Sequence, residues 1–152
     1  MMTIQQKMYE TTVKAVGGRS GYVESAAPVF SQKISTPREM GGAGGEGTNP
    51  EQLFAAGYSA CFDSALNMVA RQSRIKIEGS EVTATVSFGK VEDGGFGIGV
   101  KLDVLVKGVD HDTAVTLVNG AHAACPYSRA TRGNIAVEIN VLEEEHSFGG
   151  GY

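Results

Sequence analysis

Hydrophobic positions along the chain predict two apolar helices and several short strands. Starting at Pro50 and continuing past Val69, apolar and small side chains recur at spacings of three and four, the period of a helix with a buried face. Pro50 suits the first helical position, and Glu51 places negative charge in the first turn. Small residues fill the middle of this segment, so we expect a helix that is buried on most sides.

A second helix is predicted from about Asp112, as its N-cap, to Ala124. It should stop at Cys125, because Pro126 disfavours the helical conformation in the residue before it. This ending leaves Cys125 at a point where the backbone changes direction.

Alternating apolar and polar residues predict strands at 81–88, 97–107 and 135–142, with a turn at Asp93-Gly94-Gly95 between the first two. Residues 8–16 and 22–24 predict a further hairpin with Arg19 at or near its turn. The order of strands, helix, two strands, helix and strand indicates an α+β fold with mainly antiparallel sheet around two apolar helices.

Residues 37–48 contain five glycines and no hydrophobic periodicity, which predicts a loop. This loop lacks the Gly-Lys-Ser/Thr ending of a phosphate-binding loop, so a hinge or lid is the better interpretation. We expect a single domain over residues 1–142 and a disordered polar tail over residues 143–152.

Charge and hydropathy narrow the classes of partner. The 13 basic and 17 acidic residues give a formal net charge of −4, which argues against nucleic acid or an anionic membrane surface as a partner. No stretch reaches the roughly 18 apolar residues of a membrane span, and the start lacks the apolar stretch of a secretory signal. A cytoplasmic location is therefore expected, where lasting structural disulfides are rare.

The chain has only two cysteines, Cys61 and Cys125. In the cytosol they would be buried small hydrophobes, metal ligands or a redox pair. Cys61 lies within the first helix among small apolar residues, and such surroundings disfavour the reactive thiolate. A nearby cation would offset that cost, and Arg19 at its glycine-flanked turn is the candidate. The alternative for Arg19 is an exposed arginine of a turn.

Cys125 falls on the apolar stripe of the second helix with Leu117, Val118 and Ala121, so it should face the core. If the first helix packs there, the two thiols could meet, although a disulfide needs Cα atoms within roughly 7 Å. His122 lies three residues before Cys125 and could join both cysteines as a third zinc ligand. A zinc-binding structural protein therefore remains an alternative, even though the chain has no Cys-x-x-Cys motif.

Two segments carry a resemblance to a known family. Residues 48–62, TNPEQLFAAGYSACF, and residues 122–135, HAACPYSRATRGNI, resemble the two cysteine motifs of the Ohr/OsmC family. The tyrosine and serine shortly before Cys61, and the CPYS sequence at Cys125, resemble the organic hydroperoxide resistance branch. The resemblance extends over residues 8–142. It implies an intertwined homodimer of OsmC-like fold with two active sites at the subunit interface.

The same resemblance implies a thiol peroxidase that reduces organic hydroperoxides, including those derived from fatty acids. By position, Cys61 matches the peroxidatic cysteine and Cys125 the resolving cysteine, while Arg19 and Glu51 match a pair that sets the environment of the thiol. A dithiol reductant such as a lipoylated protein would restore the enzyme, and no cofactor or metal is implied. A redox-sensing or ligand-binding module without turnover is the alternative.

Spacing along the first helix constrains this set of residues. Glu51 precedes Cys61 by ten residues, which places them about 15 Å apart along one straight helix. Glu51 therefore holds Arg19 at a distance from Cys61, or a second subunit contributes residues to the site. The apolar side chains that could contact an alkyl substrate are Phe54, Phe62, Met68, Phe96 and Tyr127.

Overall fold

The computed structural model describes residues 1–144, which divide after Pro50 into two compact units. The predicted single domain over residues 1–142 stays a prediction, and the predicted tail lies outside the described residues from residue 145 onward. No helix among residues 1–144 has the length and apolar character needed to cross a membrane.

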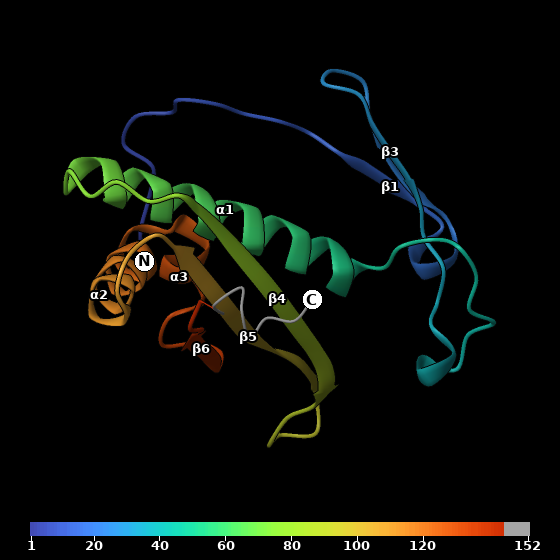
Figure 1. Cartoon of the computed structure of the whole chain (residues 1–152). Coiled ribbons are helices and arrows are strands. Elements are labelled where there is room, and N and C mark those ends of the chain that lie inside the picture. The colour runs from blue at the N-terminus through green and yellow to red at the C-terminus, as the bar shows by residue number, and fades with distance from the viewer. Residues whose placement is uncertain (145–152) are drawn as a thin grey trace. The chain divides into compact units, whose positions relative to one another are not determined.

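The first unit contains a three-stranded antiparallel sheet. Its strands are β1 (Lys14–Val16), β2 (Tyr22–Ser25) and β3 (Phe30–Lys33), in the order β1-β2-β3 (Figure 1). The predicted hairpin is confirmed, although β1 is shorter than the segment 8–16. A 3₁₀ turn, η1 (Gly18–Ser20), connects β1 to β2 and carries Arg19.

The glycine-rich segment is a loop, as predicted, with one 3₁₀ turn, η2 (Arg38–Met40). It folds back on residues just before it, since the Gly44 N–H donates to the Thr36 carbonyl at 3.0 Å. A Cβ at Gly42 would lie 2.3 Å from the same carbonyl oxygen, which leaves room for glycine alone. Close packing therefore explains at least part of the glycine content.

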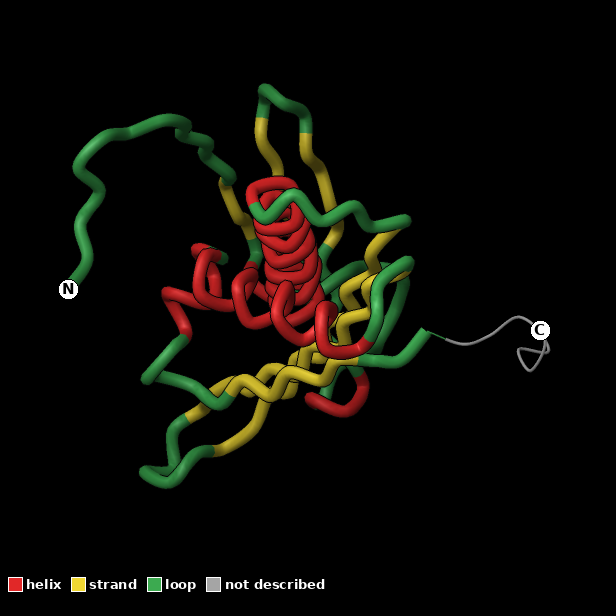
Figure 2. The backbone as a smooth tube through the Cα atoms, turned by 60° about the vertical axis from the view of Figure 1, so that its left-hand side comes forward, coloured by secondary structure: helices red, strands yellow, loops and turns green. Residues whose placement is uncertain are grey.

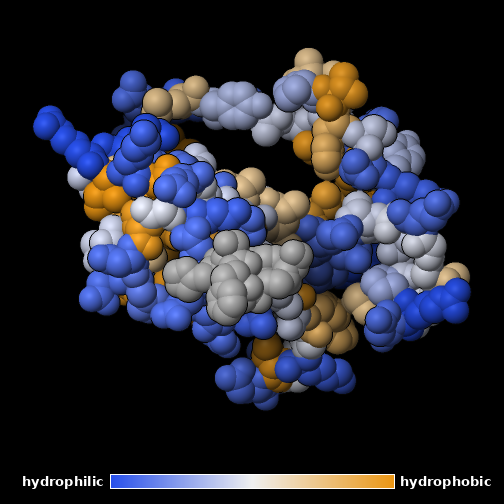
Figure 3. All heavy atoms as spheres, viewed as in Figure 1, coloured by the Kyte–Doolittle hydropathy of each residue, from blue (hydrophilic) through white to orange (hydrophobic). Residues whose placement is uncertain are grey.

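The first unit buries little apolar surface. Among residues 1–50, Ile34 is the only buried hydrophobic side chain. Four hydrophobic side chains on or beside the strands are exposed: Val13, Val16, Tyr22 and Val29. Figure 3 shows hydrophobic residues at the surface along these strands. Such a sheet lacks a core of its own and needs another surface to cover it.

The second unit contains the two predicted helices, a third short helix and a second sheet. Its elements are α1 (Pro50–Gln72, which begins at the boundary), β4 (Gly79–Lys90), β5 (Phe96–Lys107), α2 (His111–Ala124), α3 (Pro126–Thr131) and β6 (Val137–Val141). The sheet order is β4-β5-β6, with β4 antiparallel and β6 parallel to β5. Figure 2 shows the yellow strands of this sheet beside the red helices. The α+β prediction is confirmed, with one parallel strand pair in a mixed sheet.

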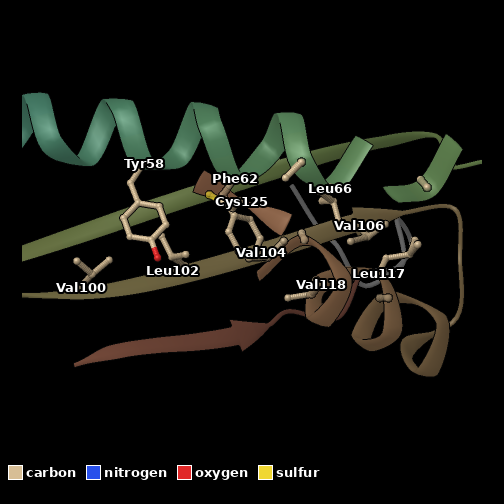
Figure 4. Close-up of a cluster of buried hydrophobic side chains, with 14 residues drawn as sticks. Tyr58, Phe62, Leu66, Val100, Leu102, Val104, Val106, Leu117, Val118 and Cys125 are labelled. Carbon is tan, nitrogen blue, oxygen red and sulfur yellow. The ribbon is translucent and has the colours of Figure 1, made fainter. Parts of the chain in front are cut away.

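The helices lie on one apolar face of this sheet. Along β5 the buried side chains alternate from Val100 to Val106 and meet those of α1 and α2. Figure 4 shows Tyr58, Phe62 and Leu66 projecting from α1 toward β5, with the α2 side chains beside them. The fully or nearly fully buried members of this core are Tyr58, Phe62, Leu66, Leu102, Val104, Leu117, Val118, Ala121 and Cys125.

Two expectations about the helices need correction. Asp110 is the N-cap of α2, not Asp112: its carboxylate accepts a hydrogen bond from the Thr113 N–H at 2.7 Å. Hydrogen bonds from the side chain and then the backbone of Thr113 lower the pKa of Asp110. Within the chain, α1 is buried on one side only, because Ala56, Ala60 and Ser64 form an exposed line of small residues at intervals of four.

The depth of this core gives a direct prediction. Leu66 is fully buried, so Leu66→Ala should lower the free energy of unfolding by about 2–5 kcal/mol through lost burial and a residual cavity. Leu142, which is 45% exposed, supplies a matched control that should lose far less as Leu142→Ala. Equal losses for the two variants in urea unfolding would contradict the assignment of the core.

Candidate functional site

The two thiols meet where α1 passes the junction of α2 and α3. The Cys61 and Cys125 sulfur atoms lie 3.7 Å apart, with the Cys125 thiol donating toward Cys61. Both cysteines are free thiols; Cys61 is partly buried and Cys125 is fully buried. The structure thus brings together the two residues that the sequence separates by 64 positions.

Pro126 fixes the place of Cys125. It ends α2, and Cys125 has the extended dihedral angles φ −62° and ψ 122°. The Cys125 N–H still donates to the Ala121 carbonyl at 2.8 Å, and the Cys125 carbonyl accepts from the Arg129 N–H at 2.9 Å. Cys125 is therefore both the C-cap of α2 and the N-cap of α3, with its backbone held from both sides.

The electrostatics of Cys61 favour the thiol over the thiolate within this unit. Burial is the largest cause that raises the pKa of Cys61, and the Cys125 thiol raises it further, because two thiolates at this distance would repel each other. A hydrogen bond from the Tyr127 backbone N–H to Cys61 lowers the pKa and opposes these effects. A positive charge beside Cys61 would favour its thiolate and oppose the effect of burial.

Aromatic side chains pack against α1 one to two turns before Cys61. The Tyr127 ring lies against Gly57, where an added Cβ would come within 2.8 Å of the tyrosine oxygen. The ring centroid of Tyr127 lies 6.1 Å from that of Phe54 and 5.7 Å from that of Tyr58. Tyr127 is partly exposed, so an apolar surface lies close to the thiols.

The other predicted apolar contacts lie elsewhere or in the core. Phe62 is fully buried in the core. Phe96 is 70% exposed and stacks on Phe88 at a centroid distance of 5.1 Å, at the β4–β5 turn. Met68 is half-buried farther along α1. Of the five candidates, Phe54 and Tyr127 are the two that pack against each other, on the N-terminal side of Cys61 along α1.

A buried group of hydroxyls joins α1 to α3 beside the thiols. The Tyr58 hydroxyl lies 2.8 Å from Ser128 Oγ and 3.2 Å from Thr131 Oγ1, and Ser128 Oγ lies 2.9 Å from His122 Nδ1. Sequence reasoning did not identify Tyr58, Ser128 or Thr131 as parts of the site. The available signal was a single tyrosine in a helix of small residues and the serine after the second cysteine.

His122 takes part in this group of hydrogen bonds. Burial is the first cause that lowers the pKa of His122, and the positive charge of Arg132 lowers it further. The Arg132 guanidinium also donates to the His122 carbonyl. Among residues 1–144, no group of three or more histidine, cysteine or acidic side chains is arranged to hold a metal ion.

Arg19 lies in the first unit, in a turn with a closely defined backbone. Its carbonyl accepts a hydrogen bond from the Thr36 hydroxyl at 3.0 Å. Gly17 has φ +82°, and a Cβ at Gly21 would fall 1.7 Å from the Val16 carbonyl oxygen, so both positions require glycine. The turn is therefore specified by its sequence, while the action of Arg19 on Cys61 stays a prediction.

Glu51 occupies the first turn of α1. The helix is continuous from Pro50 to Gln72, so the rise of about 1.5 Å per residue keeps Glu51 about 15 Å from Cys61. Direct contact between these two residues of one chain is thereby excluded. The pairing of Glu51 with Arg19 stays a prediction.

Comparisons with known proteins agree on one family. The OsmC-like protein family matches residues 42–140. The chain is 48% identical to an organic hydroperoxide resistance protein of Xanthomonas axonopodis pv. citri over 93% of this chain and 99% of that protein. Among solved structures, it resembles an organic hydroperoxide resistance protein of Elizabethkingia anophelis, with 46% identity, a TM-score of 0.87, and coverage of 92% of this chain and 100% of that one.

A further similar structure has a small molecule at its site. The organic hydroperoxide resistance protein of Vibrio cholerae, with captopril bound in one of the active sites, is 42% identical to this chain. The TM-score is 0.85, and the match covers 91% of this chain and 95% of that one.

The sulfur geometry predicts an intrachain disulfide. A disulfide bond measures about 2.05 Å, so mild oxidation requires the sulfurs to approach by about 1.7 Å from their present separation. Because both thiols lie in one unit of one chain, the oxidised protein should run as a monomer on a non-reducing denaturing gel, with a Cys61–Cys125 peptide in the digest. A covalent dimer, or two thiols that remain alkylatable, would contradict this geometry. Cys125→Ser is the control that cannot form the bond.

Proposed function

The chain belongs to the OsmC-like protein family, and we propose that it is a thiol peroxidase that reduces organic hydroperoxides to alcohols. The observation that carries this proposal is the 3.7 Å contact between the sulfurs of Cys61 and Cys125. The names of the similar proteins support the class of substrate. The aromatic surface at Tyr127 and Phe54 supports it independently, because an alkyl chain gains from apolar contact.

In the proposed reaction Cys61 is the nucleophile. Its thiolate attacks the distal oxygen of R–O–O–H, which bears the hydrogen, the O–O bond breaks, and the leaving alkoxide takes a proton to become the alcohol. Cys61 is left as a sulfenic acid. The Cys125 thiol then attacks the sulfenic sulfur, water leaves, and the Cys61–Cys125 disulfide forms. A dithiol of the lipoyl type reduces that disulfide and restores both thiols in the reducing cytosol.

Arg19 supplies the positive charge in this proposal. A guanidinium beside Cys61 would favour the thiolate and donate hydrogen bonds to the peroxide oxygens. The glycine-bounded turn supports such a role, because it fixes the backbone from which the Arg19 side chain projects. Glu51, too far along α1 to touch Cys61, would act by orienting the Arg19 guanidinium.

The proposed active form is a homodimer. The exposed strands of the first unit need a covering surface, and α1 has an exposed line of small residues that a second helix could approach closely. A second copy of the chain would satisfy both needs. Sedimentation analysis at micromolar concentration distinguishes this dimer from a monomer.

A zinc site is the less favoured alternative. The contacts of its candidate ligands are already made within the protein: His122 Nδ1 contacts Ser128, and the two sulfurs contact each other.

A redox sensor that uses the same pair of cysteines without turnover is the second alternative, and kinetics distinguish it from a peroxidase. Steady consumption of cumene hydroperoxide with a dithiol present supports the enzyme, and one stoichiometric burst that then stops supports the sensor.

Cysteine variants test the two proposed roles. Cys61→Ser should abolish reduction of tert-butyl hydroperoxide, because a serine hydroxyl cannot replace the thiolate. Cys125→Ser should complete about one turnover and then accumulate sulfinic acid at Cys61, which intact mass spectrometry detects as two added oxygens. Full activity in Cys61→Ser would end the proposal.

Removal of the proposed cation should raise the pKa of Cys61. In a Cys125→Ser background, Arg19→Gln should shift the pH profile of Cys61 alkylation to higher pH, with about a tenfold loss of thiolate per pKa unit below the midpoint. Arg71→Gln, in the last turn of α1, is the matched control and should leave the profile in place. An unchanged profile in Arg19→Gln would remove Arg19 from the site.

A further inference from the structure

The hydroxyls of Tyr58 and Ser128 and the two thiols form parallel contacts between the same two segments. On α1, Tyr58 precedes Cys61 by three residues; at the α2–α3 junction, Ser128 follows Cys125 by three. The Tyr58–Ser128 hydrogen bond measures 2.8 Å and the sulfur contact 3.7 Å. The two pairs lie about one helical turn apart, so the Tyr58–Ser128 hydrogen bond joins the two segments close to the reacting sulfur atoms.

Each hydroxyl has one proton, and this determines the direction of the hydrogen bonds. Thr131 donates to the Ser128 carbonyl at 3.2 Å, so the Tyr58 hydroxyl must be the donor to Thr131. Tyr58 then accepts from Ser128, and Ser128 accepts from the Nδ1–H of His122. Every hydroxyl donates once, and the chain of bonds runs from His122 to the backbone of α3.

Burial makes these bonds hard to replace. Tyr58 and Ser128 are fully buried and Thr131 is 7% exposed, so water has little access if a bond breaks. The helix α3 has six residues, too few to be stable without tertiary contacts. Its position relative to α1 therefore depends on these hydroxyls together with the packing of Tyr127 on Gly57.

We propose that the chain of hydrogen bonds from His122 through Ser128 and Tyr58 to Thr131 is a positioning device that holds the Cys125 thiol at attacking distance from Cys61. This inference rests on the proposed function and deepens it. The bonds hold α3, and the bond from the Arg129 N–H to the Cys125 carbonyl transmits that position to Cys125. None of these side chains needs to touch the substrate.

The position of Cys125 affects which of two reactions consumes the sulfenic acid of Cys61. In one branch the Cys125 S–H condenses with Cys61–S–OH, an S–S bond forms and water leaves. In the other branch a second hydroperoxide transfers one oxygen, which gives Cys61–SO₂H and an alcohol. A well-placed Cys125 favours the first branch, whereas a displacement of about 1 Å can slow a positioned reaction by about 100-fold.

Tyr58→Phe tests the proposal by removing one oxygen from the chain of bonds. The reduced protein is treated with rising concentrations of cumene hydroperoxide, and intact mass spectrometry gives the ratio of disulfide to sulfinic acid. Because the ratio is taken per oxidised molecule, it is independent of the rate of the first oxidation. The hydroperoxide concentration that gives equal amounts should fall about 10- to 100-fold in Tyr58→Phe. Tyr9→Phe, at a tyrosine that is 72% exposed, is the matched control and should keep the wild-type ratio.

A second pair of variants separates positioning from stability. Thr131→Val removes the acceptor of the Tyr58 proton and should shift the ratio in the same direction, while Thr131→Ser keeps the hydroxyl and should restore the wild-type ratio. Tm is measured for each variant, and the oxidation is run well below it. A lowered Tm with a wild-type ratio in both Tyr58→Phe and Thr131→Val would overturn the positioning role.

Failure of the proposed function has a different signature. A wild-type protein that forms neither disulfide nor sulfinic acid with hydroperoxide is not a thiol peroxidase, and the positioning inference then falls with it. A wild-type protein that forms the disulfide, accompanied by variants with unchanged ratios, refutes the positioning inference alone.

Discussion

The contact between the sulfurs of Cys61 and Cys125, 3.7 Å apart, is the interaction on which the proposed site depends. Pro126 ends α2 at Cys125 and turns the chain into α3, while the core between α1, β5 and α2 sets how closely α1 approaches that junction. The hydroxyls of Tyr58 and Ser128 fix the same two segments one turn away. Packing brings the thiols near each other, and directional hydrogen bonds set their alignment.

The same burial that aligns the thiols works against their ionisation. Apolar surroundings and a neighbouring thiol raise the pKa of Cys61, and the Tyr127 N–H offsets part of that effect. The proposed reaction needs the thiolate, and a cation beside Cys61 would favour that form. The closely defined turn at Arg19 and the exposed surfaces of both units are consistent with a site completed on dimerisation.

Much of this organisation follows from local sequence signals. The period of apolar residues predicts α1, the alternation predicts β4 and β5, and Pro126 alone predicts where α2 ends. Other features depend on tertiary contacts that no local pattern contains. The helix α3 is too short to show a period, and the parallel pairing of β6 depends on the path of the chain through α2 and α3. Two aspartates flank the start of α2, and only the bond to the Thr113 N–H identifies Asp110 as the cap. The hydrogen bonds of Tyr58 could not be predicted from the sequence for the same reason, since its partners lie 70 and 73 residues away.

The central claim is that the two thiols form a peroxide-reducing pair, and the stoichiometry of their oxidation tests it most directly. Metal-free reduced protein receives one equivalent of cumene hydroperoxide, and free thiols and cumyl alcohol are counted. We predict that the number of free thiols falls from two to none per chain while one molecule of cumyl alcohol forms. Two thiols that persist beside unreacted hydroperoxide would contradict it.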